Sequence, residues 1–202
     1  MMSVGIVAIV EGHGDANSVP VLLSRILRFM NVDTVHPDKP IRQKRQQIVK
    51  KGELEKAIVE LAMKKRKNVG AILVLLDADK DCPATLGPAL LMRAKQATHL
   101  PVAVVLAKRE FEAWFLGCIE SFRGFKGIPA DAEAPENPET LGGKGQFKRF
   151  CKGIKYAPSV YQAEFARRID VSLCRERCPS FDKLLRDVEA LVKAMVPETK
   201  GP

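Results

Sequence analysis

The chain has 202 residues, of which 46% are hydrophobic and 28% charged, and its 33 Lys and Arg against 24 Asp and Glu give a formal net charge of +9. This composition excludes a disordered, collagenous or integral membrane protein, and the length can bury a substantial core. The positive surplus points toward a polyanionic partner such as nucleic acid, without selecting a function.

The N-terminal segment and the cysteines bear on the compartment. The apolar run Val4–Val10 has no basic leader and meets Glu11 too early for a secretory signal. No apolar stretch reaches the roughly 20 residues of a membrane span. Five scattered cysteines, an odd number, are typical of reduced thiols. We therefore expect a cytoplasmic protein with no membrane segment.

Strands and helices alternate over the first two thirds of the chain. Buried strands are predicted from runs rich in Val, Ile and Leu: 4–10, 69–76 and 101–107, with a short strand at 31–36. Helices are predicted from apolar spacing: one capped by Asn17 or Ser18, then 53–67, 84–97 and 110–122. This alternation predicts an α/β sandwich with a mostly parallel central sheet of about four strands.

The pattern changes in the last third. Three prolines and four acidic residues between 124 and 143 are typical of an exposed loop or linker. Beyond it the chain is predicted to be helical, and apolar residues from Phe181 to Met195 recur with helical spacing. We expect an α/β core over 1–123, a loop or linker over 124–143 and a helical extension over 144–202 that packs on the core.

Two groups of acidic residues follow predicted strands at their carboxyl ends. The first is Glu11-Gly-His-Gly-Asp15, and the second is Asp77-Ala-Asp79-Lys-Asp81. Ligands bind at this edge of open parallel sheets. Asp77 and Asp79, two apart on an extended chain, would face one hard cation such as Mg²⁺ or Mn²⁺. If the two strands are neighbours, Glu11 faces the same site.

The glycines of the first group add a second feature. Gly12 and Gly14 would let the backbone approach a phosphate closely, whereas His13 is expected to be an exposed turn residue. Three carboxylates with one or two Mg²⁺ ions suffice for phosphodiester chemistry.

Other interpretations of the second group are weaker. A calcium-binding EF-hand loop would need Gly and Glu where Cys82 and Pro88 stand. A haloacid dehalogenase would need Thr at the position of Asp81. A sugar-nucleotide transferase could use Asp77 and Asp79 to hold a metal, but it leaves Glu11 unexplained.

The motifs EGHGD and LDADKD resemble those of the Toprim domain of topoisomerases, primases and nucleases. The resemblance implies a Toprim-like, Rossmann-type sandwich in which Glu11 is the general acid and base. It also implies that Asp77 and Asp79 bind Mg²⁺, with Asp15 and Asp81 as secondary carboxylates.

A longer string of segments is similar to the Toprim-related domain-of-unknown-function family 4276. The segments are VEGHGD, VLLDADKDCP, VVLAKREFEAWFL, Tyr156-Ala-Pro158, Tyr161-Gln-Ala, Ile169-Asp170 and SFDKL. This resemblance covers nearly the whole chain but names no substrate.

Two further acidic residues follow the fourth predicted strand. Glu110 and Glu112 could add carboxylates at the same edge of the sheet. Alternatively, they are acids at a helix N-terminus, which the helix dipole favours, with Trp114 and Phe115 in the core.

The positive surplus is concentrated in the segment 39–67, where eleven basic residues face three acidic ones, a local charge of +8. Such patches can neutralise the phosphates of nucleic acid, or they can be solvated surface. The residues predicted to bind phosphate are Arg42, Lys44, Arg45, Lys50 and Lys51, with Lys144 and Lys148 in a second basic run.

These observations support functions of different classes. The first is a Mg²⁺-dependent nuclease or related phosphodiester-transfer enzyme that acts on DNA or RNA, with genome defence implied by the Toprim resemblance. The second is a non-catalytic nucleic-acid-binding or regulatory subunit that works with an ATPase partner. The third is a transferase that holds a nucleotide. The sequence leaves open whether the chain forms a homodimer.

Overall fold

A parallel five-stranded sheet lies at the centre of the computed structural model, which describes residues 4–64, 69–140 and 142–195. The strands are β1 (Val4–Val10), β2 (Val35–Pro37), β3 (Ile41–Arg42), β4 (Val69–Asp77) and β5 (Val102–Ala107). Their order is β2-β1-β4-β5, and β3 also pairs with β1. The predicted α/β class with a parallel central sheet is confirmed.

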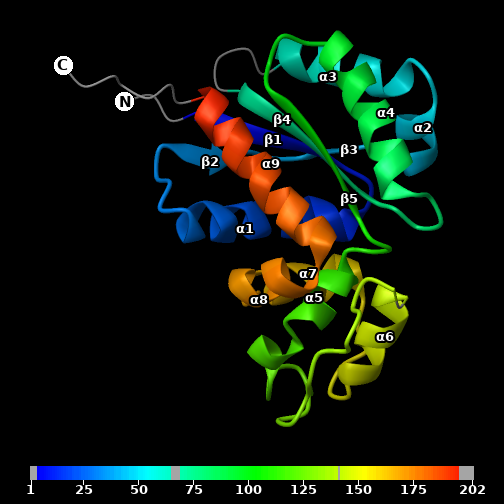
Figure 1. The fold of residues 1–202 in the computed structure, drawn as a ribbon, viewed down its shortest axis with the longest axis vertical. Coiled ribbons are helices and arrows are strands. Elements are labelled where there is room, and N and C mark those ends of the chain that lie inside the picture. Colours follow the sequence, from blue (N-terminus) through cyan, green and yellow to red (C-terminus); the bar gives the residue numbers. More distant parts are fainter. Residues whose placement is uncertain (1–3, 65–68, 141, 196–202) are drawn as a thin grey trace.

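Helices cover both faces of this sheet and extend beyond one of its edges (Figure 1). In the described residues they are α1 (His13–Phe29), α2 (Arg45–Val49), α3 (Glu53–Lys64), α4 (Pro83–Gln96), α5 (Glu112–Gly117), α6 (Gly143–Phe150), α7 (Pro158–Ala166), α8 (Val171–Arg177) and α9 (Pro179–Met195). A 3-10 turn over Ile119–Phe122 follows α5. None of these helices is both long and apolar enough to cross a membrane.

Strands β1 and β5 and the part of β4 that precedes Asp77 are apolar because both of their faces are largely buried. Ile6, Ala8 and Val10 belong to the core on the side of α1 and α9, whereas Val7 and Ile9 belong to the core on the side of α3 and α4. Successive side chains of a strand point to opposite faces, so burial on both sides requires a continuous apolar run.

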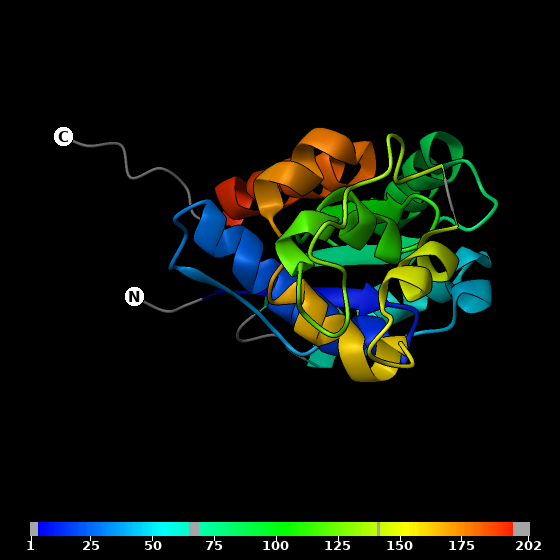
Figure 2. The same ribbon diagram turned by 90° about the horizontal axis from the view of Figure 1, so that it is seen from below.

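The segment 112–178, from α5 to the end of α8, forms a helical lobe at the carboxyl ends of the strands; in Figure 2 it lies in front of the sheet. Its core is aromatic: the rings of Phe115, Phe122, Phe147 and Phe165 lie within about 4.8–6.2 Å of one another. Aromatic pairs in tilted and edge-to-face arrangements stabilise such a cluster beyond the area that they bury. The few aromatic residues of this chain are therefore concentrated in the lobe.

Two predicted boundaries are wrong. The helix expected to be capped by Asn17 or Ser18 begins at His13, with Gly12 as its N-cap, and Pro20 lies inside it. The turn closes early because the carboxylate of Asp15 accepts the Gly12 N–H at 2.8 Å. The strand expected at 31–36 is β2, which begins only at Val35.

The C-terminal part packs closely on the core. Helix α9 lies against β5, and its Leu184 and Val188 are buried with Leu73 of β4. The segment 124–140 has no helix or strand, as predicted for a loop, but it is not exposed throughout. Ile128 is buried, and so is Glu139, whose carboxylate accepts from the Ser180 N–H at 2.9 Å. Such contacts tie this loop to α9.

Candidate functional site

The two acidic groups meet because their strands are neighbours. β1 and β4 pair in parallel, with Val10 opposite Leu75. Glu11 directly follows β1 and Asp77 is the last residue of β4. Both carboxylates therefore lie at the carboxyl edge of the sheet, where open parallel sheets bind ligands.

Four acidic side chains and one lysine line a pocket of about 310 Å³ at this edge. We call it the acidic pocket, and its charged residues are Glu11, Asp15, Asp77, Glu112 and Lys144. They come from the β1–α1 turn, the first turn of α1, β4, α5 and α6. The pocket is also lined by Gly12, His13, Gly14, Pro158, Ser159 and Gln162. The sheet and the helical lobe thus build it together.

The β1–α1 turn is held by Asp15. One carboxylate oxygen accepts the Gly12 N–H, and the other accepts from Gln162 Nε2 at 3.2 Å. A side chain at Gly14 would collide with Gln162 and Pro158 of α7. Gly14 is therefore needed for the close approach of α7 to α1, and Gly12 and Gly14 both remain at the pocket wall.

Asp77 and Glu112 are each held by one hydrogen bond. Asp77 Oδ1 accepts the N–H of Phe111 at 2.8 Å. Glu112, only 1% exposed, accepts from the hydroxyl of Tyr156 at 3.1 Å. Trp114 beside it is fully buried, as expected. Glu112 thus lines the pocket, and it is also the first residue of α5, above a buried Trp114 and Phe115, so both interpretations of this acid agree with the structure.

Glu110 lies outside the pocket and positions Lys144. Its carboxylate accepts the Lys144 backbone N–H at 2.9 Å and lies 3.6 Å from Lys144 Nζ. Burial alone would lower the pKa of Lys144, but the charges of Glu112, Glu110 and the pocket aspartates raise it above its ordinary value. Lys144 therefore stays a cation at the pocket wall.

Burial and mutual repulsion raise the pKa values of three pocket carboxylates. Burial is the main cause for Glu11, and the charge of Asp79 comes next. The pKa of Asp77 is raised well above its ordinary value by burial and then by the charge of Asp15. Burial also raises the pKa of Glu112. The acidic pocket holds more negative charge than Lys144 neutralises, so it favours a cationic ligand.

Asp79 and Asp81 line a neighbouring pocket of about 590 Å³ together with Arg45. Arg45 Nε lies 3.4 Å from Asp79 Oδ2, and its guanidinium also pairs with Asp81. It further donates to the carbonyl oxygens of Asp77 and Ala78, at 3.1 and 3.2 Å. We call residues 78–81 the Asp-loop. Its acids, unlike those of the acidic pocket, have a dedicated cation.

The extended backbone expected between Asp77 and Asp79 is not found, whereas a cation shared by their two carboxylates stays a prediction. β4 ends at Asp77, and Asp79 has a φ of +51°, in the left-handed region. The alternation of an extended strand therefore stops before Asp79. Asp79 is still near enough to Glu11 to raise its pKa.

The predicted phosphate-binding cations take different positions. Lys144 lines the acidic pocket, and Arg45 is engaged by the Asp-loop, which the sequence analysis did not foresee. The remaining five are exposed and do not line the acidic pocket: Arg42, Lys44, Lys50, Lys51 and Lys148. The cluster 65–67 lies outside the described residues.

Sequence reasoning gave no role to two polar residues of the helical lobe. Gln162 is 1% exposed and holds Asp15, while Tyr156 is 3% exposed and holds Glu112. Both fall in segments quoted for the family resemblance, but hydrophobic spacing alone does not distinguish a polar residue turned toward a site from one turned toward solvent.

One comparison with known proteins identifies a family. The model of the family "Domain of unknown function (DUF4276)" matches residues 10–189. The chain belongs to the DUF4276 family. No curated protein and no solved structure matches it.

The acidic pocket of this DUF4276 chain has oxygen atoms that are suited to bind a hard cation. Gln162 Oε1 is buried there without a hydrogen-bond partner among the described residues, beside carboxylates that repel one another. Carboxylate and amide oxygens are ligands of Mg²⁺. Within the described part of the chain no three His, Cys, Asp or Glu side chains form a ready ligand set. Mg²⁺ does not require one, because water and substrate phosphates supply most of its ligands.

Proposed function

We propose that this DUF4276 protein is a Mg²⁺-dependent nuclease or related phosphodiester-transfer enzyme of the Toprim type. The observation that carries the proposal is the acidic pocket: Glu11 and Asp77 meet at the carboxyl edge of the sheet with Asp15 and Glu112, opposite one cation, Lys144. Crowded carboxylates with raised pKa values favour a divalent cation, and such a cation can neutralise charge on a phosphate during phosphodiester cleavage.

Two aspartates are assigned to the metal. Asp77 would hold Mg²⁺ or Mn²⁺ together with Asp79, while Asp15 is a secondary carboxylate engaged by Gly12 and Gln162. When bound, the cation would act as a Lewis acid on the phosphate. The hydrogen bond from the Phe111 N–H fixes the orientation of Asp77 and uses only one of its oxygens.

Glu11 is assigned to proton transfer. Its raised pKa, caused first by burial and then by Asp79, brings the carboxyl group closer to the pH at which it can both hold and release a proton. In the proposed reaction a water oxygen bonds to phosphorus and loses a proton to solvent as the bond to the leaving ester oxygen breaks, and the Glu11 carboxyl group donates its proton to that leaving oxygen. Lys144 Nζ, kept protonated by the surrounding acids, would bind a non-bridging phosphate oxygen.

The nucleic acid would reach this pocket along exposed cations. Arg42, Lys44, Lys50 and Lys51 are exposed on the segment that leads into and out of α2. Such side chains contribute affinity without sequence specificity, and that affinity falls with salt. Genome defence and an ATPase partner remain proposals that rest on the Toprim resemblance.

The test is cleavage of plasmid DNA, single-stranded DNA and RNA by purified protein with Mg²⁺ or Mn²⁺. Wild type should cleave at least one substrate, and Glu11→Gln should be slower by about 10²-fold or more, in the range of lost acid–base catalysis. Glu176→Gln, a matched change at an exposed residue of α8, should behave like wild type. Equal activity of wild type and Glu11→Gln would show that the activity is not this site's.

The same substrates separate the proposal from a non-catalytic role. Salt-dependent nucleic-acid binding that needs no metal and survives Asp77→Ala, without cleavage, would favour the regulatory subunit. Thermal stabilisation by nucleotides without nucleic-acid binding would favour the transferase.

A further inference from the structure

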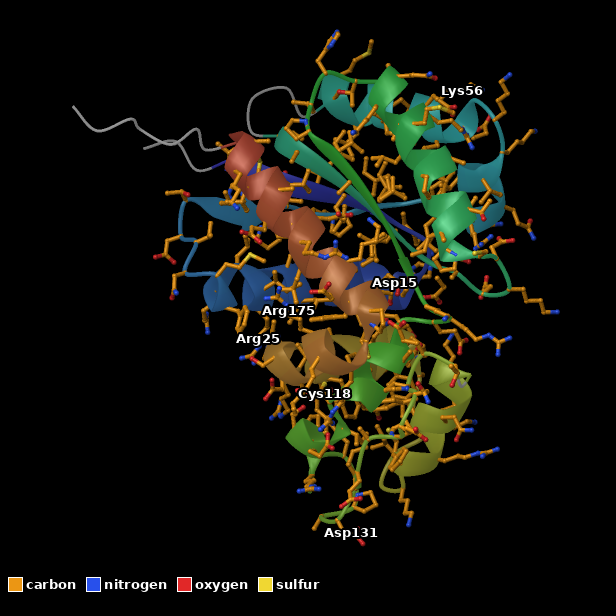
Figure 3. The ribbon with its side chains drawn as sticks, viewed as in Figure 1. Asp15, Arg25, Lys56, Cys118, Asp131 and Arg175 are labelled. Carbon is orange, nitrogen blue, oxygen red and sulfur yellow. The ribbon has the colours of Figure 1, made fainter. Side chains whose placement is uncertain are left out.

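A second charged pocket lies at the far end of α1 from the acidic pocket. It has a volume of about 300 Å³ and lies among α1, the 3-10 turn and the start of α8. Its charged residues are Arg25, Arg28, Arg168 and Asp170. Asp15 and Arg25 are ten residues apart on α1, which places them about 15 Å from each other along the helix. Figure 3 shows them along the same helix, with Arg25 beside α8. The two pockets are therefore distinct.

This pocket has an excess of positive charge, whereas the acidic pocket has an excess of negative charge. Three guanidinium groups line it, and Asp170 is its single acid. Asp170 Oδ1 already accepts the Leu173 N–H at 3.0 Å and caps α8. Within the described part of the chain none of the three arginines forms an ion pair with a carboxylate. Like charges gathered around one pocket repel, and an anion placed among them would remove that repulsion.

Arg25 has an unused donor that is already buried. Its Nη2 donates to the carbonyl oxygen of Ile169 at 2.7 Å, which fixes the guanidinium in place. Its Nε is buried and has no hydrogen-bond partner among the described residues. A buried donor without a partner is costly, so the Arg25 guanidinium is incompletely satisfied by the described residues alone.

The other two arginines are held differently. Arg168 stacks on the ring of Phe125, with its guanidinium carbon 3.8 Å from the ring centre. This stacking fixes the plane in which the N–H groups of the guanidinium lie. Arg28 is exposed near the end of α1. Ser172, also exposed, brings a hydroxyl group to the rim. Two guanidinium groups held by contacts and one exposed guanidinium group suit an anion with several oxygens.

We propose that this pocket, lined by Arg25, Arg28 and Arg168, binds a phosphoryl group. Guanidinium groups donate paired hydrogen bonds that match phosphate oxygens, and three of them can surround a tetrahedral anion. The same chemistry could come from a small phosphorylated compound or from the backbone of a nucleic acid, and the probes below separate these sources. The inference does not depend on catalysis in the acidic pocket.

The experiment is isothermal titration calorimetry on the full chain in EDTA, at constant ionic strength set with NaCl. The probes are inorganic phosphate, adenosine monophosphate and an eight-nucleotide oligothymidylate without a terminal phosphate. Wild type should bind inorganic phosphate, and Arg28→Gln/Arg168→Gln should bind it on the order of ten-fold more weakly, because two charge-assisted contacts are lost. Asp77→Asn should bind it like wild type, which keeps this test separate from the proposed nuclease.

The matched control changes two exposed cations that do not line the pocket. Arg167→Gln/Lys95→Gln carries the same change in net charge and should retain wild-type binding. Thermal melts without phosphate should show that both double variants are folded, and Arg28→Gln alone serves if the loss of the Phe125 stacking destabilises the fold. Competition by the oligonucleotide would identify backbone phosphate, and tighter binding of the mononucleotide a small compound. Equal binding by wild type and the pocket variant, or no binding of any probe, would overturn the proposal.

Discussion

The acidic pocket and the Asp-loop are neighbours at one edge of the sheet, but the carboxylates of the loop are paired with a cation and those of the pocket are crowded together. In the Asp-loop, Asp79 and Asp81 are exposed and share Arg45, whose side chain is 14% exposed. In the acidic pocket, Glu11 and Asp77 are crowded with other acids and have raised pKa values. The ion pairs of Arg45 with the two aspartates hold the Asp-loop in place. The unpaired carboxylates of the acidic pocket repel one another and therefore favour the binding of a cation.

The largest effect is expected from neutralising the acid at the centre of the pocket. Asp77→Asn keeps the acceptor for the Phe111 N–H but removes a proposed metal ligand. Metal-dependent cleavage should fall by about 10²-fold or more, as expected when charge stabilisation is lost. Without metal, the variant should melt at the same temperature as wild type or higher, because a repelling charge is gone. A lower melting temperature would mean that Asp77 is stabilising in the free protein.

Breaking the Asp-loop should instead cost stability. Arg45→Gln leaves two aspartates without their cation and two carbonyl oxygens without their donor. The free energy of unfolding, from urea titration, should fall by about 1–3 kcal/mol, the range for hydrogen bonds to charged groups. Arg42→Gln, an exposed change in the same segment, should stay within about 0.5 kcal/mol of wild type. An equal loss of unfolding free energy in both variants would contradict the proposal that Arg45 stabilises the Asp-loop.

The pH dependence of stability should distinguish the two kinds of carboxylate. A group whose pKa is raised by folding contributes stability at low pH that is lost as the pH rises through its folded-state pKa. Glu11, Asp77 and Glu112 are such groups. Metal-free wild type should therefore lose a part of its stability as the pH rises from about 4, where model carboxyl groups ionise, through the raised folded-state pKa values. Asp77→Asn should show a flatter profile in thermal melts, and Mg²⁺ should restore stability at neutral pH.

Glu55, a carboxylate that is fully paired, serves as the reference because folding lowers its pKa instead of raising it. Its substitution should have the smallest effect on stability. Glu55 accepts two hydrogen bonds from Arg93, at 2.7 and 2.8 Å, and this pairing lowers its pKa to about 2. Its stabilisation is present above the unfolded-state pKa and is lost as the pH falls toward 2. Glu55→Gln should lower stability by about 1 kcal/mol at pH 7, since the pair is partly solvated. The difference from wild type should shrink in melts below about pH 4.

The sheet edge could be predicted from the sequence because its signals are local. Val4–Val10 and Val69–Asp77 are continuous apolar runs that end at acids, and this is enough to predict two buried strands with Glu11 and Asp77 after them. The α/β alternation predicts that the strands are parallel, but the adjacency of β1 and β4, which brings the two acids together, is known only from the structure. The family resemblance led to the same residues.

The walls of the site could not be predicted because they depend on packing between distant segments. Gln162 reaches Asp15 across 147 residues, and Tyr156 reaches Glu112 across 44. Arg45 looked like a free phosphate-binding cation because the sequence does not show that the Asp-loop folds back onto it. The left-handed backbone at Asp79 likewise has no signature in its neighbours, since Asp adopts that region more readily than most residues but not regularly.

The contribution of α6 and α7 to the acidic pocket bears on how the chain can be divided. A fragment that ended near residue 123 would contain every acid of the pocket but neither Lys144 nor Gln162. It would also expose the side of α1 on which Gly14 fits against Pro158. The helical lobe is therefore part of the binding site rather than an appendage, and a truncation at this boundary should remove one wall of the acidic pocket.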